Sequence, residues 1–390
     1  MRNRYMDEAA SNSPFEDALD VYLASAEIAY ANPAAIHRQG EYSQMVLDIA
    51  VDSVKKFING RPEDHVYFTS GATEGNSIVI QGLLRADKLY RTYVSPMEHN
   101  DILELCNWLR SYKCSYLSPI FLEVKECTGV VDVDKLNDKL EFQHSYSAGE
   151  RTLVVIQGAN GEIGTVQPLK EICAIVHKYG GIVMSDMTQL LPDRPVDIQE
   201  LDVDIVTCSS QKLGGIKGSG FIYIKDGIDI EPVIFGEQGL RGGTPNTPAI
   251  AAFAWCLDHI RENDLWHRRY YYVPLHFVLS ELEDVEGCEI IGSPDLSERV
   301  SNIVPIMFKN CSLKGQQIVS LLSEQGFCIS AGSACSNYVD RPSHALMAIG
   351  LTGDEARNVI RLSTGFNNIH IEDWLAVCNR IKDIVTMYKK

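Results

Sequence analysis

Three side chains capable of chemistry each follow a predicted β-strand of this sequence. Lys212, Asp186 and His99 come at or just after the ends of short apolar runs. In an open parallel sheet, ligands bind beyond the carboxyl ends of the strands, so these side chains are expected to lie near one another. A lysine next to a buried strand usually needs a partner or a chemical role. The set fits pyridoxal 5′-phosphate (PLP): Lys212 would form the Schiff base with the aldehyde, Asp186 would keep the pyridine nitrogen protonated, and His99 would stack on the ring.

Residues 69–73, TSGAT, offer a site for the phosphate of the same cofactor. These small residues open a predicted helix, and the backbone N–H groups at a helix start, aided by the helix dipole, bind anions. Asn160, Gln189 and Gln211 are further polar residues at or near the ends of predicted strands.

Taken singly, the candidates have simpler interpretations. Asp186 could cap a helix, Asn160 could form a turn, and His99 could be a hydrogen-bonded structural histidine. The PLP hypothesis therefore rests on the joint occurrence of these residues, which is far more specific than any one of them.

Cys335 lies in the segment 330–342, SAGSACSNYVDRP, where its neighbours are small or polar. Most cysteines in folded proteins are buried among apolar side chains, so this thiol is expected to be presented instead of packed. The simpler interpretation is a surface cysteine on a mobile loop. The other cysteines mostly fall in helical or strand patterns and are expected to be packing residues, as Cys173, Cys208 and Cys378 illustrate.

The framework that would position these residues can be predicted from the apolar pattern. Between residues 65 and 224, apolar β-rich runs alternate with helical patterns, which predicts a mostly parallel sheet with helices on both faces. After about Trp255 the pattern changes, with predicted strands at 299–308 and 358–365 and an amphipathic helix at 371–388. The apolar side of that helix is predicted to consist of Trp374, Leu375, Cys378, Ile381 and Val385.

This change of pattern predicts two domains in an α/β protein. Residues 12–255 would form a large PLP-binding domain, and residues 256–390, together with 1–11, a smaller α+β domain. The length of 390 residues also favours two domains over one.

Composition argues against several classes of function. The chain has 35 Lys and Arg against 52 Asp and Glu, a net charge of −17, which disfavours nucleic acid and anionic membranes as partners. The longest apolar run, 249–257, is too short to span a bilayer, and no secretory signal is recognised. Eleven cysteines without a C-x-x-C pair make a disulfide framework or zinc ribbon a poor interpretation and favour a reducing cytoplasm. No H-E-x-x-H or P-loop motif occurs, so no metal site is predicted.

A series of motifs resembles the NifS/IscS-like cysteine desulfurases, which are PLP enzymes of fold type I grouped with the class V aminotransferases. The order and approximate spacing of the motifs match from Tyr5 to Arg361, nearly the whole chain. The motifs are FTSGATEGNS, MEHNDIL, NGEIGTVQPL, SDMTQ, SSQKLGGIKGSGFIYI, LRGGTPN, GSACSN and NVIRLSTG, and NPAAIHRQG is similar to the N-terminal substrate-side segment. The resemblance implies a large domain with a mostly parallel seven-stranded sheet and a small α+β domain that carries a catalytic cysteine loop.

The resemblance also implies a role for each matching position. Lys212 would be the Schiff-base lysine, Asp186 would pair with the pyridine nitrogen, and His99 would lie over the ring. The other implied positions are Gln189 near the phenolic oxygen; Ala72, Thr73, Ser209 and Gln211 at the phosphate; Thr244 at the phosphate of the neighbouring subunit in a homodimer; and Arg361, helped by Asn32, at the substrate carboxylate.

In the same family, a cysteine in the place of Cys335 attacks the sulfur of the bound substrate, becomes a persulfide and leaves alanine behind. The attack requires a thiolate. The small residues 331–334 fit a loop that moves between the cofactor and a sulfur acceptor. The implied substrate is therefore L-cysteine, and the implied partner is a protein sulfur acceptor or scaffold.

Two positions depart from the family's pattern. Gly161 stands where the family usually has the asparagine expected at the phenolic oxygen, so Asn160 or Gln189 would have to supply that contact. Gln211 replaces a histidine and can donate to a phosphate but cannot titrate near neutral pH. The alternative function is another class V enzyme, an aminotransferase or a selenocysteine lyase, in which Cys335 is incidental. A non-catalytic relative is disfavoured because the cofactor residues are retained.

Overall fold

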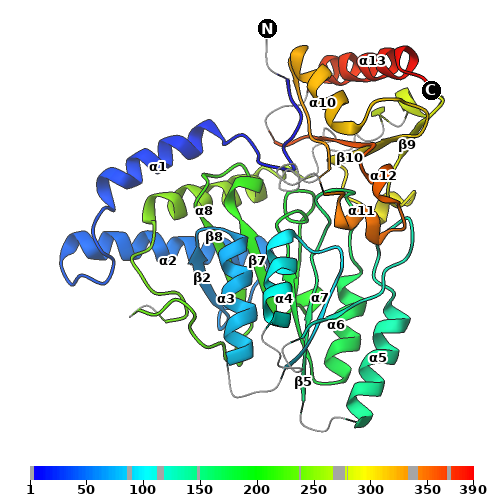
Figure 1. Ribbon diagram of the computed structural model, residues 1–390. Coiled ribbons are helices and arrows are strands. Elements are labelled where there is room, and N and C mark those ends of the chain that lie inside the picture. Colours follow the sequence, from blue (N-terminus) through cyan, green and yellow to red (C-terminus); the bar gives the residue numbers. More distant parts are fainter. Residues whose placement is uncertain are drawn as a thin grey trace.

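A seven-stranded sheet runs through the centre of the molecule in the computed structural model (Figure 1). Its strands are β2 (His65–Thr69), β3 (Tyr90–Val94), β4 (Ile120–Phe121), β5 (Arg151–Val155), β6 (Ile182–Asp186), β7 (Ile205–Ser209) and β8 (Gly220–Ile224). They lie in the order β2-β8-β7-β6-β5-β3-β4; β8 is antiparallel to both β2 and β7, and the other neighbouring pairs are parallel. The structure describes residues 4–85, 90–111, 118–146, 150–236, 239–266, 277–278, 280–332, 341–366 and 370–390.

Helices cover both faces of this sheet, as the apolar strands require. The helices on one face are α3 (Ala72–Arg85) and α4 (Asn100–Ser111), and those on the other are α5 (Val133–Tyr146), α6 (Leu169–Lys178), α7 (Ile198–Leu201) and α8 (Thr247–Glu262). Successive residues of a strand point to opposite faces, so Leu153 packs in the core under α3 and α4, and Val154 packs in the core on the other face of the sheet. This arrangement confirms the predicted α/β fold with a mostly parallel sheet.

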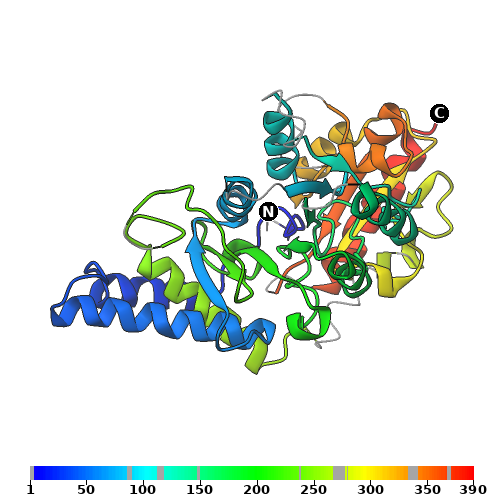
Figure 2. The ribbon, with the colours of Figure 1, turned by 90° about the horizontal axis from the view of Figure 1, so that it is seen from below.

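Two long helices extend to one side of the sheet. Helices α1 (Glu16–Ile28) and α2 (Arg38–Ile58) pack against α8 and form an arm that projects from the rest of the molecule (Figure 2). Several large apolar side chains of this arm are exposed, namely Leu19, Leu23, Ile28, Tyr30, Ile36, Met45 and Ile49.

The C-terminal part has its own sheet and core. Strands β9 (Cys288–Ile290), β10 (Ile303–Phe308) and β12 (Val359–Ser363) form an antiparallel sheet in the order β12-β10-β9. The helices of this part are α10 (Gly315–Glu324), α11 (His344–Ala348), α12 (Gly353–Ala356) and α13 (Ile371–Met387), with a 3₁₀ turn at η3 (Leu296–Glu298). Another 3₁₀ turn, η2 (Ser210–Lys212), follows β7 of the central sheet. The N-terminal strand β1 (Arg4–Tyr5) pairs in parallel with β11 (Phe327–Cys328), so the start of the chain joins the C-terminal part.

The strands and helices predicted from the apolar pattern occur, with one error in α13. Trp374, Cys378, Ile381 and Val385 are buried as predicted, but Leu375 is 43% exposed. The prediction for Leu375 was wrong because that residue lies at the edge of the apolar side of α13 and is not part of the C-terminal core. None of the described helices combines the length and the apolar character needed to cross a membrane.

The packing cysteines are in the core as predicted. Cys173, Cys208 and Cys378 are fully buried, and burial raises the pKa of each thiol, to about 12 for Cys173 and Cys378. Because only a thiolate is a strong nucleophile, these three are unreactive at neutral pH. Cys335 lies outside the described residues.

Candidate active site

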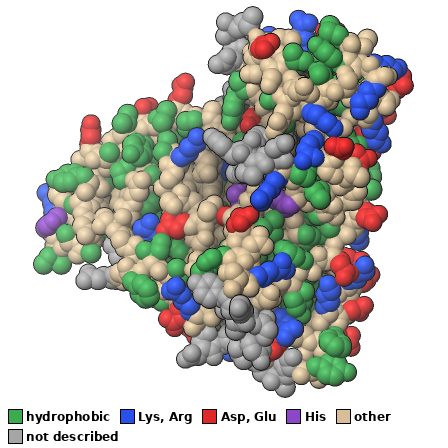
Figure 3. Space-filling view, in the orientation of Figure 1, with side chains coloured by type: hydrophobic (Ala, Val, Ile, Leu, Met, Phe, Trp, Pro, Cys, Tyr) green, Lys and Arg blue, Asp and Glu red, His purple; other side chains and the backbone are tan. Residues whose placement is uncertain are grey.

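A pocket opens at the carboxyl ends of β5, β6 and β7, below the N-terminal segment and β12. The cavity has a volume of about 240 Å³. Ten of the thirteen predicted site residues line it, namely Ala72, Thr73, His99, Asn160, Asp186, Gln189, Ser209, Gln211, Lys212 and Arg361. In the space-filling view, histidine, acidic and basic side chains gather near the middle of the face that Figure 3 shows. The strand-end argument therefore placed most of these residues together correctly.

Three predicted residues are not in this group. Asn32 and Thr244 are exposed and do not line the pocket, and Cys335 lies outside the described part of the chain. Residues beside Asn32 and Thr244, however, line one shared hollow next to α2, which includes Pro33 and Gly243. The structure therefore brings these two chain segments to the same surface, outside the pocket.

Asp186 ends β6 at the floor of the pocket. Its Oδ1 accepts a hydrogen bond from the backbone N–H of Thr188 at 3.0 Å, and its Oδ2 accepts one from Asn76 Nδ2 at 3.0 Å. Burial, and secondarily the charge of Asp101, raise the pKa of Asp186 above its ordinary value. A buried carboxylate of this kind is stabilised by a neighbouring cationic N–H group, which is what a protonated pyridine supplies.

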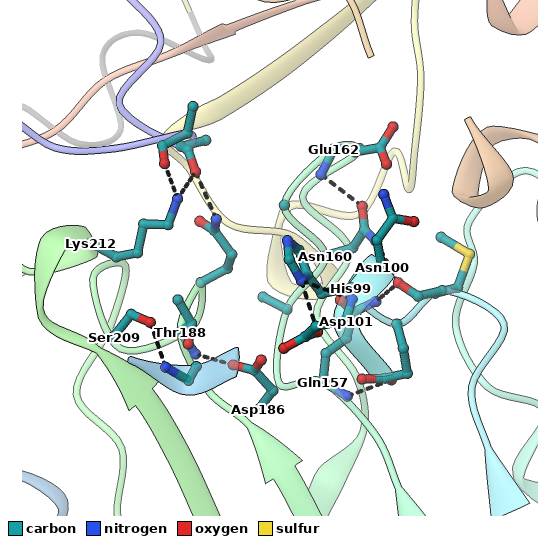
Figure 4. A pocket seen from close by; sticks show the side chains of 18 of the residues that line it. His99, Asn100, Asp101, Gln157, Asn160, Glu162, Asp186, Thr188, Ser209 and Lys212 are labelled. Carbon is teal, nitrogen blue, oxygen red and sulfur yellow. Dashed lines mark hydrogen bonds and ion pairs between the residues drawn. The ribbon is translucent and has the colours of Figure 1, made fainter. Parts of the chain in front are cut away.

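Lys212 enters the pocket from the turn that follows β7. Its Nζ donates a hydrogen bond to the backbone O of Ala9 at 2.6 Å and also contacts the backbone O of Ala10 (Figure 4). Gln189 Nε2 donates to the same Ala9 O at 2.9 Å. The N-terminal segment therefore provides polar backbone groups for the lysine and the glutamine on the side opposite the sheet.

The start of α3 forms a cradle for an anion. Ser209 Oγ accepts a hydrogen bond from the backbone N–H of Ala72 at 2.7 Å, and Thr73 follows in the first turn. A Cβ at Gly71 would lie 3.2 Å from Ser209 Oγ, so a glycine keeps the backbone open at this place. Helix α3 is long enough for its dipole and first N–H groups to attract a phosphate.

Arg361 reaches the pocket from β12. Its side chain is only 5% exposed, and its Nη2 lies 2.6 Å from Asp7 Oδ1, while Nη1 donates to the backbone O of Gly161 at 2.8 Å. Its Nε is buried and has no hydrogen-bond partner among the described residues. A guanidinium with an unsatisfied donor beside a pocket is suited to bind a carboxylate.

The side chain of Asn160 forms hydrogen bonds with the backbone around it. Its Nδ2 donates to the backbone O of Met97 at 3.0 Å, and its Oδ1 accepts from the N–H groups of Glu162 and Ile163 at 2.8 and 2.9 Å. These contacts are those of a turn residue, the simpler interpretation of the sequence. A side chain at Gly161 would meet Gln189, with its Cβ 3.1 Å from Gln189 Nε2.

His99 precedes the first residue of α4 and pairs with Asp101. His99 Nδ1 lies 2.8 Å from Asp101 Oδ1 (Figure 4). Asp101 Oδ2 accepts a hydrogen bond from Asn76 Nδ2 at 3.1 Å. Burial by itself would raise the pKa of Asp101, but its hydrogen bond with His99, together with the charge of His99, outweighs burial and holds this pKa below its usual value.

Several polar residues in or beside this pocket were not among the predicted site residues. Asn76 links Asp101 to Asp186, Glu98 is fully buried, and His344 Nε2 lies 2.8 Å from the backbone O of Glu98. Asp101 could have been found from its place two residues after His99 at the start of a helix, and Glu98 from its place directly before His99 at the end of a predicted strand, whereas Asn76 and His344 gave no comparable signal. Among the residues that the structure describes, no group of three or more His, Cys, Asp or Glu side chains is placed to hold a metal ion.

Comparison with protein families gives a match over almost the whole chain. The family described as "Aminotransferase class-V" matches residues 4–372. The cysteine desulfurase IscS 1 of Archaeoglobus fulgidus is 29% identical, with the match covering 99% of this chain and all of the relative. The cysteine desulfurase IscS of Dictyoglomus turgidum is 31% identical over 93% of this chain and 90% of the relative.

Solved structures with the same fold include proteins of related description. A "NifS-like protein" has a TM-score of 0.84 and 26% identity, covering 99% of this chain and 100% of that one. A structure described as "SspA in complex with cysteine" has a TM-score of 0.77 and 26% identity, covering 93% of this chain and 99% of that one.

Proposed function

The chain belongs to the class V aminotransferase family, and from this premise we propose that it is a PLP-dependent cysteine desulfurase. The reaction converts L-cysteine and the thiol of Cys335 into L-alanine and a persulfide on Cys335. The observation that carries the proposal is the convergence of ten predicted cofactor and substrate residues on one pocket. Relatives named as cysteine desulfurases over nearly the full chain support the same reaction.

The residues of the pocket fit PLP. Lys212 would hold the cofactor covalently through its aldehyde, Asp186 would pair with the pyridine nitrogen, and the start of α3 with Ser209 would bind the phosphate. When bound, PLP supplies an electron sink that weakens the bonds at the α-carbon of an amino acid. His99 would lie against the ring, and Gln189 would lie at the phenolic oxygen. The raised pKa of Asp186 and the open backbone at Gly71 are the features that support this fit.

Arg361 would bind the α-carboxylate of L-cysteine. The buried Nε without a described partner gives it donor capacity for a ligand, and its planar group can hold a carboxylate through two parallel hydrogen bonds. Gly161 and Asp7 hold the guanidinium in place from the other sides, at 2.8 and 2.6 Å. Asn32 does not line this pocket, so its proposed help at the carboxylate would come from a second copy of the chain.

We further propose that the enzyme is a homodimer. The exposed apolar side chains of α1 and α2, seen as green patches over the projecting arm in Figure 3, would be covered by a second copy. Asn32 and Thr244 point to the same arrangement, because both lie outside the pocket of their own subunit and beside one hollow. Thr244 would then complete the phosphate site of the neighbour.

The remaining proposals concern organisation and partners. Residues 12–255 would act as the PLP-binding domain, and residues 256–390 with 1–11 as the small domain, which the separate C-terminal core supports. A protein acceptor or scaffold would take the sulfur from Cys335, and the acidic chain is not expected to bind nucleic acid or membranes. The enzyme would work in the cytoplasm, where free cysteines remain reduced.

The test measures alanine release from L-cysteine under reductant for the wild type and Cys335→Ser. We expect alanine from the wild type and hardly any from Cys335→Ser. The matched control is Cys127→Ser, which removes an exposed thiol outside the pocket and should keep wild-type release. Equal alanine release from the wild type and Cys335→Ser would favour the alternative, an enzyme such as a selenocysteine lyase in which Cys335 is incidental. Amino transfer that depends on a keto acid would instead favour an aminotransferase.

A further inference from the structure

We propose that Asp101 is a positioning residue that holds His99 as the tautomer with its proton on Nδ1, and that Asn76 joins this pair to Asp186. The catalytic consequence rests on the proposed desulfurase function, whereas the tautomer is a property of this chain alone. The pair lies at the N-terminus of α4, where the side chain of His99 is 56% exposed and that of Asp101 only 9%. Asp101 is therefore anchored in the protein, and the imidazole faces the pocket.

Two groups compete for Nδ1 of His99. Asp101 Oδ1 lies 2.8 Å away and can only accept a proton when ionised, whereas the backbone N–H of Asp101 lies 3.4 Å away and could only donate. Nδ1 cannot satisfy both, because it carries either a proton or a lone pair. The shorter contact involves a charge and is the stronger hydrogen bond, so Nδ1 carries the proton.

The state of Asp101 agrees with this assignment. Burial by itself would raise the pKa of Asp101, but its hydrogen bonds with His99 and Asn76, and the charge that His99 carries when protonated, hold this pKa below its usual value, so the carboxylate is ionised at neutral pH. Both of its oxygens accept hydrogen bonds: Oδ1 also from the backbone N–H of Ile102 at 2.8 Å, and Oδ2 from Asn76 Nδ2 at 3.1 Å. A neutral His99 with a proton on Nδ1 has its lone pair on Nε2, the nitrogen that can then take up a proton.

Asn76 connects the histidine to the floor of the pocket. Its Nδ2 donates to Asp101 Oδ2 at 3.1 Å and to Asp186 Oδ2 at 3.0 Å, and its Oδ1 accepts from Thr207 Oγ1 at 2.6 Å. The Thr207 hydroxyl fixes which way the amide points, so both carboxylates face N–H groups. One amide therefore positions the aspartate expected at the pyridine nitrogen and the aspartate that orients His99.

The predicted catalytic effect is a stronger base at His99. A carboxylate on Nδ1 orients the ring and stabilises the imidazolium that forms when Nε2 takes a proton. The other titratable or charged groups that line the same pocket are Glu98, Glu162, Asp186, Lys212, His344 and Arg361. Burial raises the pKa of Glu98 well above its usual value, so Asp101 is the ionised carboxylate that contacts the ring.

The test compares the wild type with Asp101→Asn in the full-length holoenzyme. Asparagine keeps the size of the side chain but removes the charge. In one orientation its NH2 group faces the donor Asn76 Nδ2, and in the other it faces the donor N–H of Ile102. We expect kcat for alanine release to fall about 10- to 100-fold with little change in KM. The acid limb of the pH profile should move to lower pH.

A second readout does not depend on activity. With ¹⁵N-labelled histidine, NMR of the wild type should give a protonated Nδ1 and an unprotonated Nε2 for His99, assigned by the signals lost in His99→Gln. Asp101→Asn should shift the tautomer balance towards Nε2–H. The matched control is Asp204→Asn, which removes the carboxylate 2.8 Å from His177 Nε2 outside the pocket and should leave kcat and the His99 signals unchanged.

An Nε2–H tautomer of His99 in the wild type would overturn the inference, even if Asp101→Asn failed to fold. Wild-type kcat, pH profile and His99 signals in Asp101→Asn would overturn it as well. If the wild type released no alanine, the desulfurase function would fail, while the NMR measurement would still decide the tautomer.

Discussion

Replacing Arg361 by lysine tests how the substrate carboxylate is bound. Lysine keeps the positive charge near Asp7, so this half-buried carboxylate is not left without a cation. It has a single nitrogen, however, and cannot serve Asp7, the backbone O of Gly161 and a substrate carboxylate with the geometry of a planar fork. The variant should therefore fold and lose affinity for L-cysteine.

The size of the loss follows from the hydrogen bonds involved. A hydrogen bond to a charged group contributes about 1.5–3 kcal/mol, and a change from a two-pronged to a single contact removes one of them. A loss of about 2 kcal/mol corresponds to a roughly 30-fold increase in KM, since about 1.4 kcal/mol is tenfold. kcat should change much less, because the charge that neutralises the carboxylate remains.

The assay is steady-state alanine release as a function of L-cysteine concentration, with circular dichroism to verify the fold. Arg357→Lys is the matched control, because Arg357 lies four residues earlier, outside the pocket, and its Nη1 contacts a backbone oxygen at 3.3 Å. The control should keep the KM of the wild type. An Arg361→Lys enzyme with an unchanged KM would refute the assignment of Arg361 to the carboxylate.

Three further perturbations address the departure from the family pattern, pH and the core. Gly161→Asn should fold with a free energy of unfolding within about 1 kcal/mol of the wild type by urea titration, because its Cβ would lie 3.1 Å from the end of a flexible side chain that can move. The hydrogen bond of Asp204 raises the pKa of His177, so the stability from this pair is present below pH ~6.5 and lost as pH rises through the folded pKa. The difference in unfolding free energy between the wild type and His177→Gln should thus be larger at pH ~6 than at pH ~8.5, and an equal difference would contradict the pairing. Trp374→Ala should cost about 3–5 kcal/mol in a urea titration because this residue is 1% exposed, whereas Leu375→Ala, 43% exposed, should stay within about 0.5 kcal/mol.

The fold could be predicted from sequence because its strands are short and apolar on both faces. Such runs, separated by helical patterns, have few arrangements other than a parallel sheet between helix layers. The reversed direction of β8 was not predicted, although a physical signal exists. Only ten residues separate Ser209, the last residue of β7, from Gly220, the first of β8, and a parallel neighbour needs a crossover of a dozen or more residues.

The site was predicted in outline for a related reason. Residues at the ends of adjacent parallel strands must meet, so Asp186, Gln211 and Lys212 could be placed together without knowing any side-chain contact. Leu375 shows the limit of the same kind of reasoning, because a helical pattern gives the direction of a side chain but not where the opposing surface stops. Asn32 and Thr244 lie beyond this limit too, since a single chain does not contain the surface against which they are proposed to act.

The contacts that tune the site depend on distances that no spacing rule supplies. Asn76 looks like an ordinary polar residue of a helix, yet its amide lies between two carboxylates that come from α4 and β6. Because the two N–H bonds of this one amide serve Asp101 and Asp186, a change in the charge of either carboxylate is expected to alter how the amide is held against the other. The histidine over the proposed cofactor and the aspartate under it are therefore expected to titrate as one coupled unit, and a pH profile of this enzyme should report that unit and not a single residue.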